Sequence, residues 1–297
     1  MCVIYLSFRA DAAWRLVVAA NRDEFHERPT AALHAWNDED GILAGRDLRG
    51  GGTWMGVHRD GRFAALTNFR EPAAVPGPAP SRGGLVTEYL REGGDPASWL
   101  ERVAARADAY AGFSLFASDL ETLAHFSNRS GSVRTLPPGR YAISNGLLGD
   151  PWPKVVRGLA AFERALGETS VGAPSRRAPR QNVTSAREGS RRDAAATWEA
   201  LTDTFLDVLR DATPAGDGDL PDTGVGPDRE KMLSPIFIRG SEYGTRSSSV
   251  ILVGEGGEGE FVEESFGPDA VPAGRAAERF RAAAGPGPDG SSSRGSR

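Results

Sequence analysis

MCVIYLSFRADAAWRLVVAANRDE, residues 1–24, contains two apolar runs separated by a short polar turn. The runs CVIYLSF and WRLVVAA are rich in β-branched and aromatic residues, a composition that is typical of β-strands. We predict that they pair as an antiparallel hairpin centred near Asp11, which places Cys2 opposite Ala20 or Asn21. Local pairing alone therefore brings the single cysteine of the chain beside the polar tetrad NRDE that follows the second run.

Cys2 is a candidate nucleophile because of its position in the chain. Cysteine is small enough for the initiator Met1 to be removed in a cell, and Cys2 would then carry both a thiol and a free α-amino group. Such an amine has an ordinary pKa of about 7.7–8.0 and can act as the general base for the neighbouring thiol, so no histidine is required. The competing interpretation is that Cys2 is a small apolar residue on a buried strand.

The tetrad can supply the groups that such a nucleophile needs. Because side chains alternate along a strand, Asn21 and Asp23 are expected on one face and Arg22 and Glu24 on the other. Asp23 could orient the α-amine, and Arg22 could lower the pKa of the thiol. A surface turn is the alternative interpretation of these four residues.

Three residues at the ends of later strands extend the candidate site. Asn68 and Asn145 each end a predicted strand, where an amide can donate to a developing oxyanion or simply form a turn. Arg246 lies at the start of a strand in the run YGTR. A fixed guanidinium there could bind a substrate carboxylate or pair with Asp23.

The remaining chain predicts hairpins and separate helices. Strands are expected at 41–45, 53–58, 62–68, 113–119, 121–128, 139–145, 236–238, 247–253 and 261–266. Helices are expected at 81–92, after the N-cap Asp95, after the N-cap Asp150 and at 193–210, while 25–37 is predicted to be irregular. Strands that cluster in hairpins indicate an α+β protein with antiparallel sheets rather than alternating βαβ units.

The length of 297 residues is consistent with one large domain, which we place at residues 1–267. Within it, 167–192 and 211–228 have no apolar periodicity and are predicted to be disordered insertions. Residues 268–297 are predicted to be a mostly disordered tail that begins with a weak helix.

The composition argues against several functional classes. A single cysteine excludes an internal disulfide framework, and the four histidines have no metal-ligand spacing, so we expect no metal site. The net charge of −5 gives no reason to expect nucleic acid binding. No apolar run approaches the roughly 20 residues of a membrane span, and the start lacks a secretory signal. We expect a cytoplasmic protein that binds a small-molecule substrate or ligand, and the oligomeric state stays open.

An ordered series of motifs resembles the NRDE family, also called the Transport and Golgi organisation protein 2 family. The motifs are MCVIYLSF, NRDEF, GGTWMGV, LTNFRE, SRGGLV, ISNGLLGDPWPKV and YGTRSSSVILV. The resemblance implies an N-terminal-nucleophile hydrolase-like fold, an αββα sandwich of two stacked antiparallel sheets between helical layers. It also implies cleavage of a non-peptide amide bond by Cys2 after Met1 removal, as in choloylglycine hydrolases and acid amidases. Family members are also linked to haem trafficking and to lipid or acyl-CoA metabolism, so a protein that carries haem or an acyl chain is the alternative; no other cofactor is expected.

The hydrolase relatives carry an Arg-Asn-x-Asp pattern on their second strand. On this chain the pattern falls on residues 20–23, where Asn21 and Asp23 match and Ala20 occupies the arginine position. Arg22 or Arg246 would then supply the positive charge. Asn145 resembles the oxyanion asparagine of those enzymes, and Asn21 is expected to support the hairpin.

Overall fold

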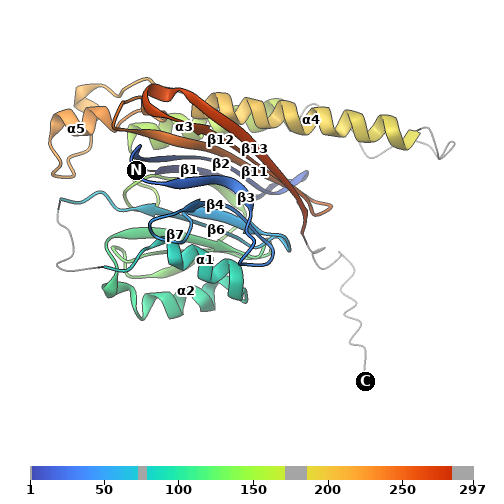
Figure 1. Cartoon of the computed structure of the whole chain (residues 1–297), viewed down its shortest axis with the longest axis horizontal. Helices are drawn as coiled ribbons and strands as arrows, with labels where there is room; N and C mark the ends of the chain where they lie inside the picture. Colours follow the sequence, from blue (N-terminus) through green and yellow to red (C-terminus); the bar gives the residue numbers. More distant parts are fainter. Residues whose placement is uncertain (1, 73–78, 171–185, 283–297) are drawn as a thin grey trace.

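The strands form two antiparallel sheets, and helices lie on the outer side of each sheet (Figure 1). The computed structural model describes residues 2–72, 79–170 and 186–282, and the side chains of 168–170 and 186–197 are outside this description. The four-layer αββα sandwich that the family resemblance implies is confirmed, and so is the α+β class that the hairpins and helices indicate.

The first sheet has six strands in the order β10-β1-β2-β11-β12-β13. Their bounds are β1 Cys2–Asp11, β2 Trp14–Phe25, β10 Gly139–Ile143, β11 Tyr243–Gly254, β12 Glu258–Phe266 and β13 Pro272–Arg281. The second sheet has the order β3-β4-β5-β6-β7-β8-β9. Its strands are β3 Thr30–Ala35, β4 Ile42–Asp47, β5 Met55–His58, β6 Phe63–Asn68, β7 Phe113–Ser118, β8 Leu123–Ser127 and β9 Val133–Leu136. The β1–β2 hairpin is therefore internal to its sheet.

Helices cover the two outer faces. α1 (Gly83–Glu92) and α2 (Pro96–Ala104) pack on the seven-stranded sheet, and α3 (Pro153–Ser170) and α4 (Ala186–Leu209) pack on the six-stranded sheet. The start of α2 follows from its sequence, because the Asp95 side chain accepts the Ser98 backbone N–H at 2.7 Å and proline occupies the first helical position.

Strand alternation divides the apolar side chains between two cores. On β1, Ile4, Leu6 and Phe8 belong to the core between the sheets, whereas Val3 and Tyr5 belong to the core between the first sheet and its helices. Both faces of β1 are thus buried. This explains why its sequence is almost continuously apolar rather than alternating.

The register of the β1–β2 hairpin differs from the prediction by one or two residues. Cys2 pairs with Arg22, not with Ala20 or Asn21, and Ile4 pairs with Ala20. The turn lies one residue later than expected, and the ladder shifts between Phe8 and Asp11. The predicted division of the tetrad between the two faces does not depend on this register, because it follows from the alternation of side chains along β2.

Most of the predicted elements are present. They are β4, the β5–β6 and β7–β8 hairpins, β10, β11, β12, α1, α2 and the buried stripes of α3 and α4. Three predictions are corrected. Part of the segment 25–37 is the strand β3, residues 236–238 form a buried loop rather than a strand, and α3 begins at Pro153 rather than directly after Asp150. The Asp150 carboxylate instead accepts the Leu147 backbone N–H at 2.7 Å.

The predicted disordered segments also need correction. Residues 167–170 and 186–192 are helical, and the rest of the 167–192 insertion, 171–185, lies outside the described residues. The segment 211–226 is an ordered loop tied down by hydrogen bonds from Phe237 N to Asp211 O and from Ala215 N to Ser234 Oγ, and 227–228 begin a helix. Within the predicted tail, β13 is an edge strand, while 283–297 is not described. The alternation of β13 between exposed and half-buried positions is too weak for its sequence to indicate a strand, and the strand depends on pairing with β12.

Candidate active site

A cavity of about 620 Å³ lies between the two sheets, at the end of the hairpin that carries Cys2. Its walls come from β2, β11 and β12 of the first sheet, from β3, β4 and β6 of the second, and from the segment that leads into α1. The sequence-predicted residues that line it are Cys2, Arg22, Asp23, Asn68 and Arg246. The structure therefore brings five of the seven candidate residues to one cavity.

Cys2 is the first residue of β1 and is 7% exposed. Its carbonyl oxygen accepts a hydrogen bond from the Ser144 hydroxyl at 2.8 Å, which fixes the start of the strand against the end of β10. Burial raises the pKa of the Cys2 thiol, the Asp23 carboxylate acts in the same direction, and the Arg22 guanidinium opposes it. A thiol held in its protonated form requires a base before it can act as a nucleophile.

Asp23 is among the lining residues, but its carboxylate is directed to the other face of β2, where residues from two distant elements hold it. One oxygen accepts the Thr245 hydroxyl at 2.7 Å, and the other lies 4.0 Å from the Lys154 ammonium. The Asp23 carbonyl accepts the Tyr243 hydroxyl at 3.1 Å. Burial raises the pKa of Asp23, and the positive charge of Lys154 opposes that change.

Lys154 is a member of this cluster that the sequence interpretation missed. It lies in the first turn of α3, and its side chain is 2% exposed. Burial lowers the pKa of Lys154 to about 8. Two signals in the sequence could have identified it. Lys154 is one of only two lysines in the chain, and within the motif PWPKV it stands directly before Val155, the first residue of the apolar stripe of α3.

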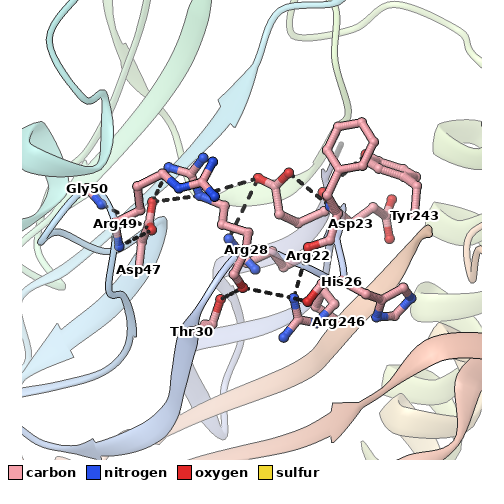
Figure 2. Close-up of polar contacts among 12 residues, drawn as sticks. Arg22, Asp23, His26, Arg28, Thr30, Asp47, Arg49, Gly50, Tyr243 and Arg246 are labelled. Atoms are coloured by element: carbon pink, nitrogen blue, oxygen red, sulfur yellow. Dashed lines mark hydrogen bonds and ion pairs between the residues drawn. The ribbon is translucent and has the colours of Figure 1, made fainter. Parts of the chain in front are cut away.

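Arg22 extends toward the cavity from the β2 position directly opposite Cys2. Its side chain is 8% exposed, and its Nη2 lies 3.7 Å from the Glu24 carboxylate. Its Nη1 is buried and has no hydrogen-bond partner among the described residues. Figure 2 shows the neighbouring Arg28 between Asp47 and the end of β2, with 2.6 Å between Arg28 Nη2 and the Asp47 carboxylate.

Arg246 lines the cavity but does not pair with Asp23, the partner that the sequence suggested. Its Nη1 donates to the carbonyl oxygens of Phe25, His26 and Arg28 at 3.0–3.1 Å (Figure 2). Arg246 therefore holds the turn after β2 in place. Lys154, from α3, occupies the position beside Asp23 instead.

The three candidate asparagines have different surroundings. Asn21 faces the helical layer, where its amide donates to the Leu209 and Ile236 carbonyls at 2.8 and 2.9 Å and its oxygen accepts the Ser248 hydroxyl. It ties β2 to the end of α4, to the loop at Ile236 and to β11, and it does not line the cavity. Asn145 is also outside the cavity lining, and its amide donates to the Asn68 carbonyl at 2.8 Å. Asn68 is the asparagine that lines the cavity, and Asn145 positions it.

Arg82 and Glu263 are further lining residues that the sequence interpretation did not select. The glycine run packs closely against the start of α1, since a Cβ on Gly52 would lie 2.6 Å from the Gly83 carbonyl. This packing positions Arg82, the residue directly before Gly83. Burial lowers the pKa of Arg82, and its proximity to Cys2 opposes that change. Glu263 on β12 accepts the Leu33 backbone N–H at 2.8 Å, and burial raises its pKa. An alternating polar strand such as FVEESF does not reveal which glutamate is buried.

A buried ion pair connects the cavity region to α5 (Pro227–Met232). Arg70, just after β6, pairs with Glu230, and the two side chains are 2% and 3% exposed. The Glu230 carboxylate also accepts the Thr223 backbone N–H and hydroxyl at 2.9 and 2.6 Å. The Arg70 guanidinium lies 4.6 Å above the Trp152 ring. Thr223, from the segment predicted to be disordered, thus helps to hold Glu230 against Arg70 at the end of β6, which carries Asn68.

Two properties of the described residues bear on the remaining expectations. Residues 2–72, 79–170 and 186–282 contain no cluster of three histidine, cysteine or acidic side chains arranged to hold a metal ion. Within the same ranges, no helix combines the length and apolar character required to cross a membrane.

Comparison with known proteins identifies the family. The sequence model for Transport and Golgi organisation 2 matches residues 1–268. The Transport and Golgi organization 2 homolog of Mus musculus is 32% identical over 286 residues, covering 90% of this chain and 93% of the mouse protein. The Drosophila melanogaster Transport and Golgi organization protein 2 is 28% identical over 293 residues, covering 90% and 92%.

Two solved structures are similar at low sequence identity. The Caenorhabditis elegans N-acylethanolamine-hydrolyzing acid amidase ortholog is 10% identical with a TM-score of 0.42, covering 84% of this chain and 92% of that structure. The C2A mutant of conjugated bile acid hydrolase from Clostridium perfringens is 10% identical with a TM-score of 0.41, covering 95% and 92%. The match of the family model over residues 1–268, together with relatives alike over nine-tenths of this chain, shows that the chain belongs to the Transport and Golgi organisation 2 family.

Proposed function

We propose that this protein hydrolyses a non-peptide amide bond with Cys2 as the nucleophile, after removal of Met1. The observation that carries the proposal is the position of Cys2 at the start of an internal strand, facing a cavity of about 620 Å³. Arg22 is its direct cross-strand partner, and Asn68 lines the same cavity. Cavities of this size accommodate small-molecule ligands.

The α-amino group of Cys2 would act as the base. It takes the thiol proton, and the sulfur attacks the amide carbonyl carbon to form a tetrahedral intermediate. The side chain of Asn68 would donate to the developing oxyanion, and Asn145 acts by positioning Asn68. The C–N bond then breaks, and the leaving amine takes the proton from the α-ammonium. Water attacks the resulting thioester with the α-amine again as base, which releases the carboxylic acid and restores the thiol.

Asp23 and Lys154 would set the charge around that amine. An ionised Asp23 favours the ammonium form that appears after each proton transfer. The contact of 4.0 Å with Lys154 and the hydrogen bond from Thr245 favour the ionised form of Asp23 despite its burial. In this scheme Lys154 is a positioning residue that acts through Asp23.

The proposal is tested at the N-terminus and at the thiol. Intact mass is expected to show the loss of Met1, and an electrophilic amide analogue is expected to label Cys2 in the native protein but not in Cys2→Ala. Asn68→Ala should slow acylation roughly 10²- to 10³-fold, the effect of removing one oxyanion donor. Asn37→Ala changes an exposed asparagine just after β3 that does not line the cavity; it is the matched control and should react normally. Retention of Met1, or absence of labelling, would show that self-activated hydrolysis is wrong.

We also propose, as a second candidate function, that the protein binds and carries haem or an acyl-CoA. The arginine-rich lining of the cavity supports this proposal, because haem and acyl-CoA are both anionic. Cys2 is the only cysteine, histidine or methionine among the described lining residues, so a haem iron would have one side chain of the ordinary ligand types there. This proposal expects saturable binding that survives Cys2→Ala. Neither a spectral shift with haem nor thermal stabilisation by acyl-CoA would be seen if it is wrong. Both proposed functions leave Cys2 as a free thiol, and the reducing cytoplasm keeps thiols in that form, so we propose a cytoplasmic location.

A further inference from the structure

Six arginines line the cavity, and they fall into two groups by their partners. The six are Arg22, Arg28, Arg46, Arg82, Arg246 and Arg275. Three are neutralised by a carboxylate at short distance: Arg28 by Asp47 at 2.6 Å, Arg46 by Asp38 at 2.7 Å and Arg275 by Asp203 at 2.9 Å. The other three have no carboxylate that close among the described residues.

Arg22 is the most deeply buried of these three. Its side chain is 8% exposed, and the nearest carboxylate in the described part of the chain, that of Glu24, is 3.7 Å away. The Nη1 of Arg22 has no hydrogen-bond partner among the described residues although it is buried. Burying a guanidinium without a full set of acceptors costs free energy, and an anion that supplies them recovers it.

Arg82 and Arg246 add positive charge to the same cavity. Arg82 Nη1 donates to the Gly112 carbonyl at 2.7 Å, and the described residues offer it no carboxylate within 4.0 Å. The Nη1 of Arg246 is occupied by three backbone carbonyls, while its Nε is buried without a hydrogen-bond partner in the described ranges. Neither side chain forms an ion pair within 4.0 Å in the described part of the chain, although the Glu24 carboxylate acts on both at longer range.

The acidic residues of the lining set the charge of the anion that would bind. Glu24 lies near both Arg22 and Arg28, and Glu263 already accepts the Leu33 N–H and the Ser249 hydroxyl. The Glu24 carboxylate, 3.7 Å from Arg22, and the Glu263 carboxylate, which is electrostatically coupled to Arg22, disfavour a doubly charged phosphate more than a singly charged carboxylate. The planar guanidinium also matches a carboxylate in its bidentate geometry.

We propose that the cavity binds a carboxylate group of its amide ligand at Arg22, with Arg82 as the second cationic contact. Arg22 and Cys2 are cross-strand partners, and such pairs have Cα atoms about 4.5–5.5 Å apart, so the carboxylate would lie only a few bonds from the scissile carbonyl. As a statement about a substrate, this inference rests on the proposed hydrolysis. The binding preference itself can be measured without turnover.

The test compares two probes that differ only in charge, N-octanoylglycine and its neutral analogue N-octanoylglycinamide. Calorimetric titration of the Cys2→Ala protein separates binding from catalysis. The acid is expected to bind roughly 10- to 100-fold more tightly than the amide, the effect of one hydrogen-bonded charge pair. Arg22→Met should reduce that ratio to below about threefold, and Arg22→Lys should restore part of it because the charge remains.

Arg279→Met is the matched control. This arginine lies on β13 outside the cavity lining, pairs with Glu260, and has a side chain that is 74% exposed. It should keep the full preference for the acid. Thermal melting verifies the fold of each variant, and Arg82→Met, with the same expected loss, replaces Arg22→Met if the latter does not fold.

Equal affinity for acid and amide would overturn the inference, as would binding of neither probe at about 10 mM. Preference retained in both Arg22→Met and Arg82→Met would overturn it as well. If the acid binds preferentially but wild-type protein hydrolyses no amide, the carboxylate site stands and the proposed hydrolysis fails.

Discussion

Replacement of Lys154 by methionine is expected to change how the stability of the protein depends on pH. The Lys154 ammonium is buried, 4.0 Å from Asp23, with Cys2 and Arg70 close enough to affect it electrostatically. Tyr5 and Tyr243 lie near the Asp23 carboxylate as well. Methionine has similar length and no charge, so Lys154→Met removes the titration and keeps most of the packing.

The magnitude follows from the pKa of Lys154, which burial lowers from 10.5 to about 8. Between those two pH values the lysine binds a proton in the unfolded chain and not in the folded protein. Stability rises with pH wherever the unfolded state binds more protons. At about 1.4 kcal/mol per pH unit, the free energy of unfolding of the wild type should increase by about 3 kcal/mol, relative to Lys154→Met, as the pH rises from 8 to 10.5.

Two measurements test this expectation. Urea denaturation of both proteins across pH 7–11 gives the difference in their unfolding free energies, in which groups common to both largely cancel. Because the chain has only two lysines, ¹³C NMR of lysine labelled at Cε should show two resonances, one of which titrates near 8. Lys231→Met assigns them and serves as the control, since Lys231 pairs with Asp217 and its side chain is 39% exposed.

The same variant has a consequence for Cys2. Without the lysine charge the pKa of Asp23 should rise further, so the acid limb of Cys2 labelling should move to higher pH in Lys154→Met and stay in place in Lys231→Met. Parallel stability curves for wild type and Lys154→Met, or a Lys154 resonance that titrates near 10.5, would refute the reasoning.

Three further predictions concern the residues that support the site. Glu230→Gln should lower the free energy of unfolding by about 3–5 kcal/mol, because it leaves the Arg70 charge buried without its carboxylate. Urea denaturation measures this change, and a loss below about 1 kcal/mol would contradict the prediction. Asn21→Ala leaves two buried carbonyls and a buried hydroxyl without their partner, so a loss of roughly 3 kcal/mol or more is expected in the same assay, with Asn37→Ala unchanged. Gly158→Ala places a methyl 1.9 Å from the Tyr5 hydroxyl, which should lower the melting temperature in calorimetry, whereas Gly158→Ala combined with Tyr5→Phe should recover part of the loss.

The layered architecture was predictable because each element carries a local signal. Strand composition, the glycine turn at Gly61 and the Asp95 cap are contained within a few residues of sequence and were interpreted correctly. β13 and the ordered loop at 211–226 were missed because their order depends on partners elsewhere, namely β12 and the Arg70–Glu230 pair.

Within the candidate site, the sequence by itself determined the neighbourhood of Cys2. Strand pairing over a short turn brings Cys2 to the end of β2, and alternation divides the tetrad between two faces. The register could not be fixed from the sequence, because it depends on where the turn closes, at Asp11–Trp14, and on a one-residue shift of the ladder between Phe8 and Asp11 that leaves Arg22 opposite Cys2.

Only the tertiary structure decided which charges surround that corner. Thr245 reaches Asp23 from 222 residues away, and Lys154 arrives from α3 on the opposite side of the sheet from the cavity. Burial then sets what these groups do, since the same lysine and carboxylate on a surface would keep their ordinary pKa values. Sequence specifies which side chains are near along the chain, whereas packing of distant elements specifies which are paired, which are buried and which face the cavity.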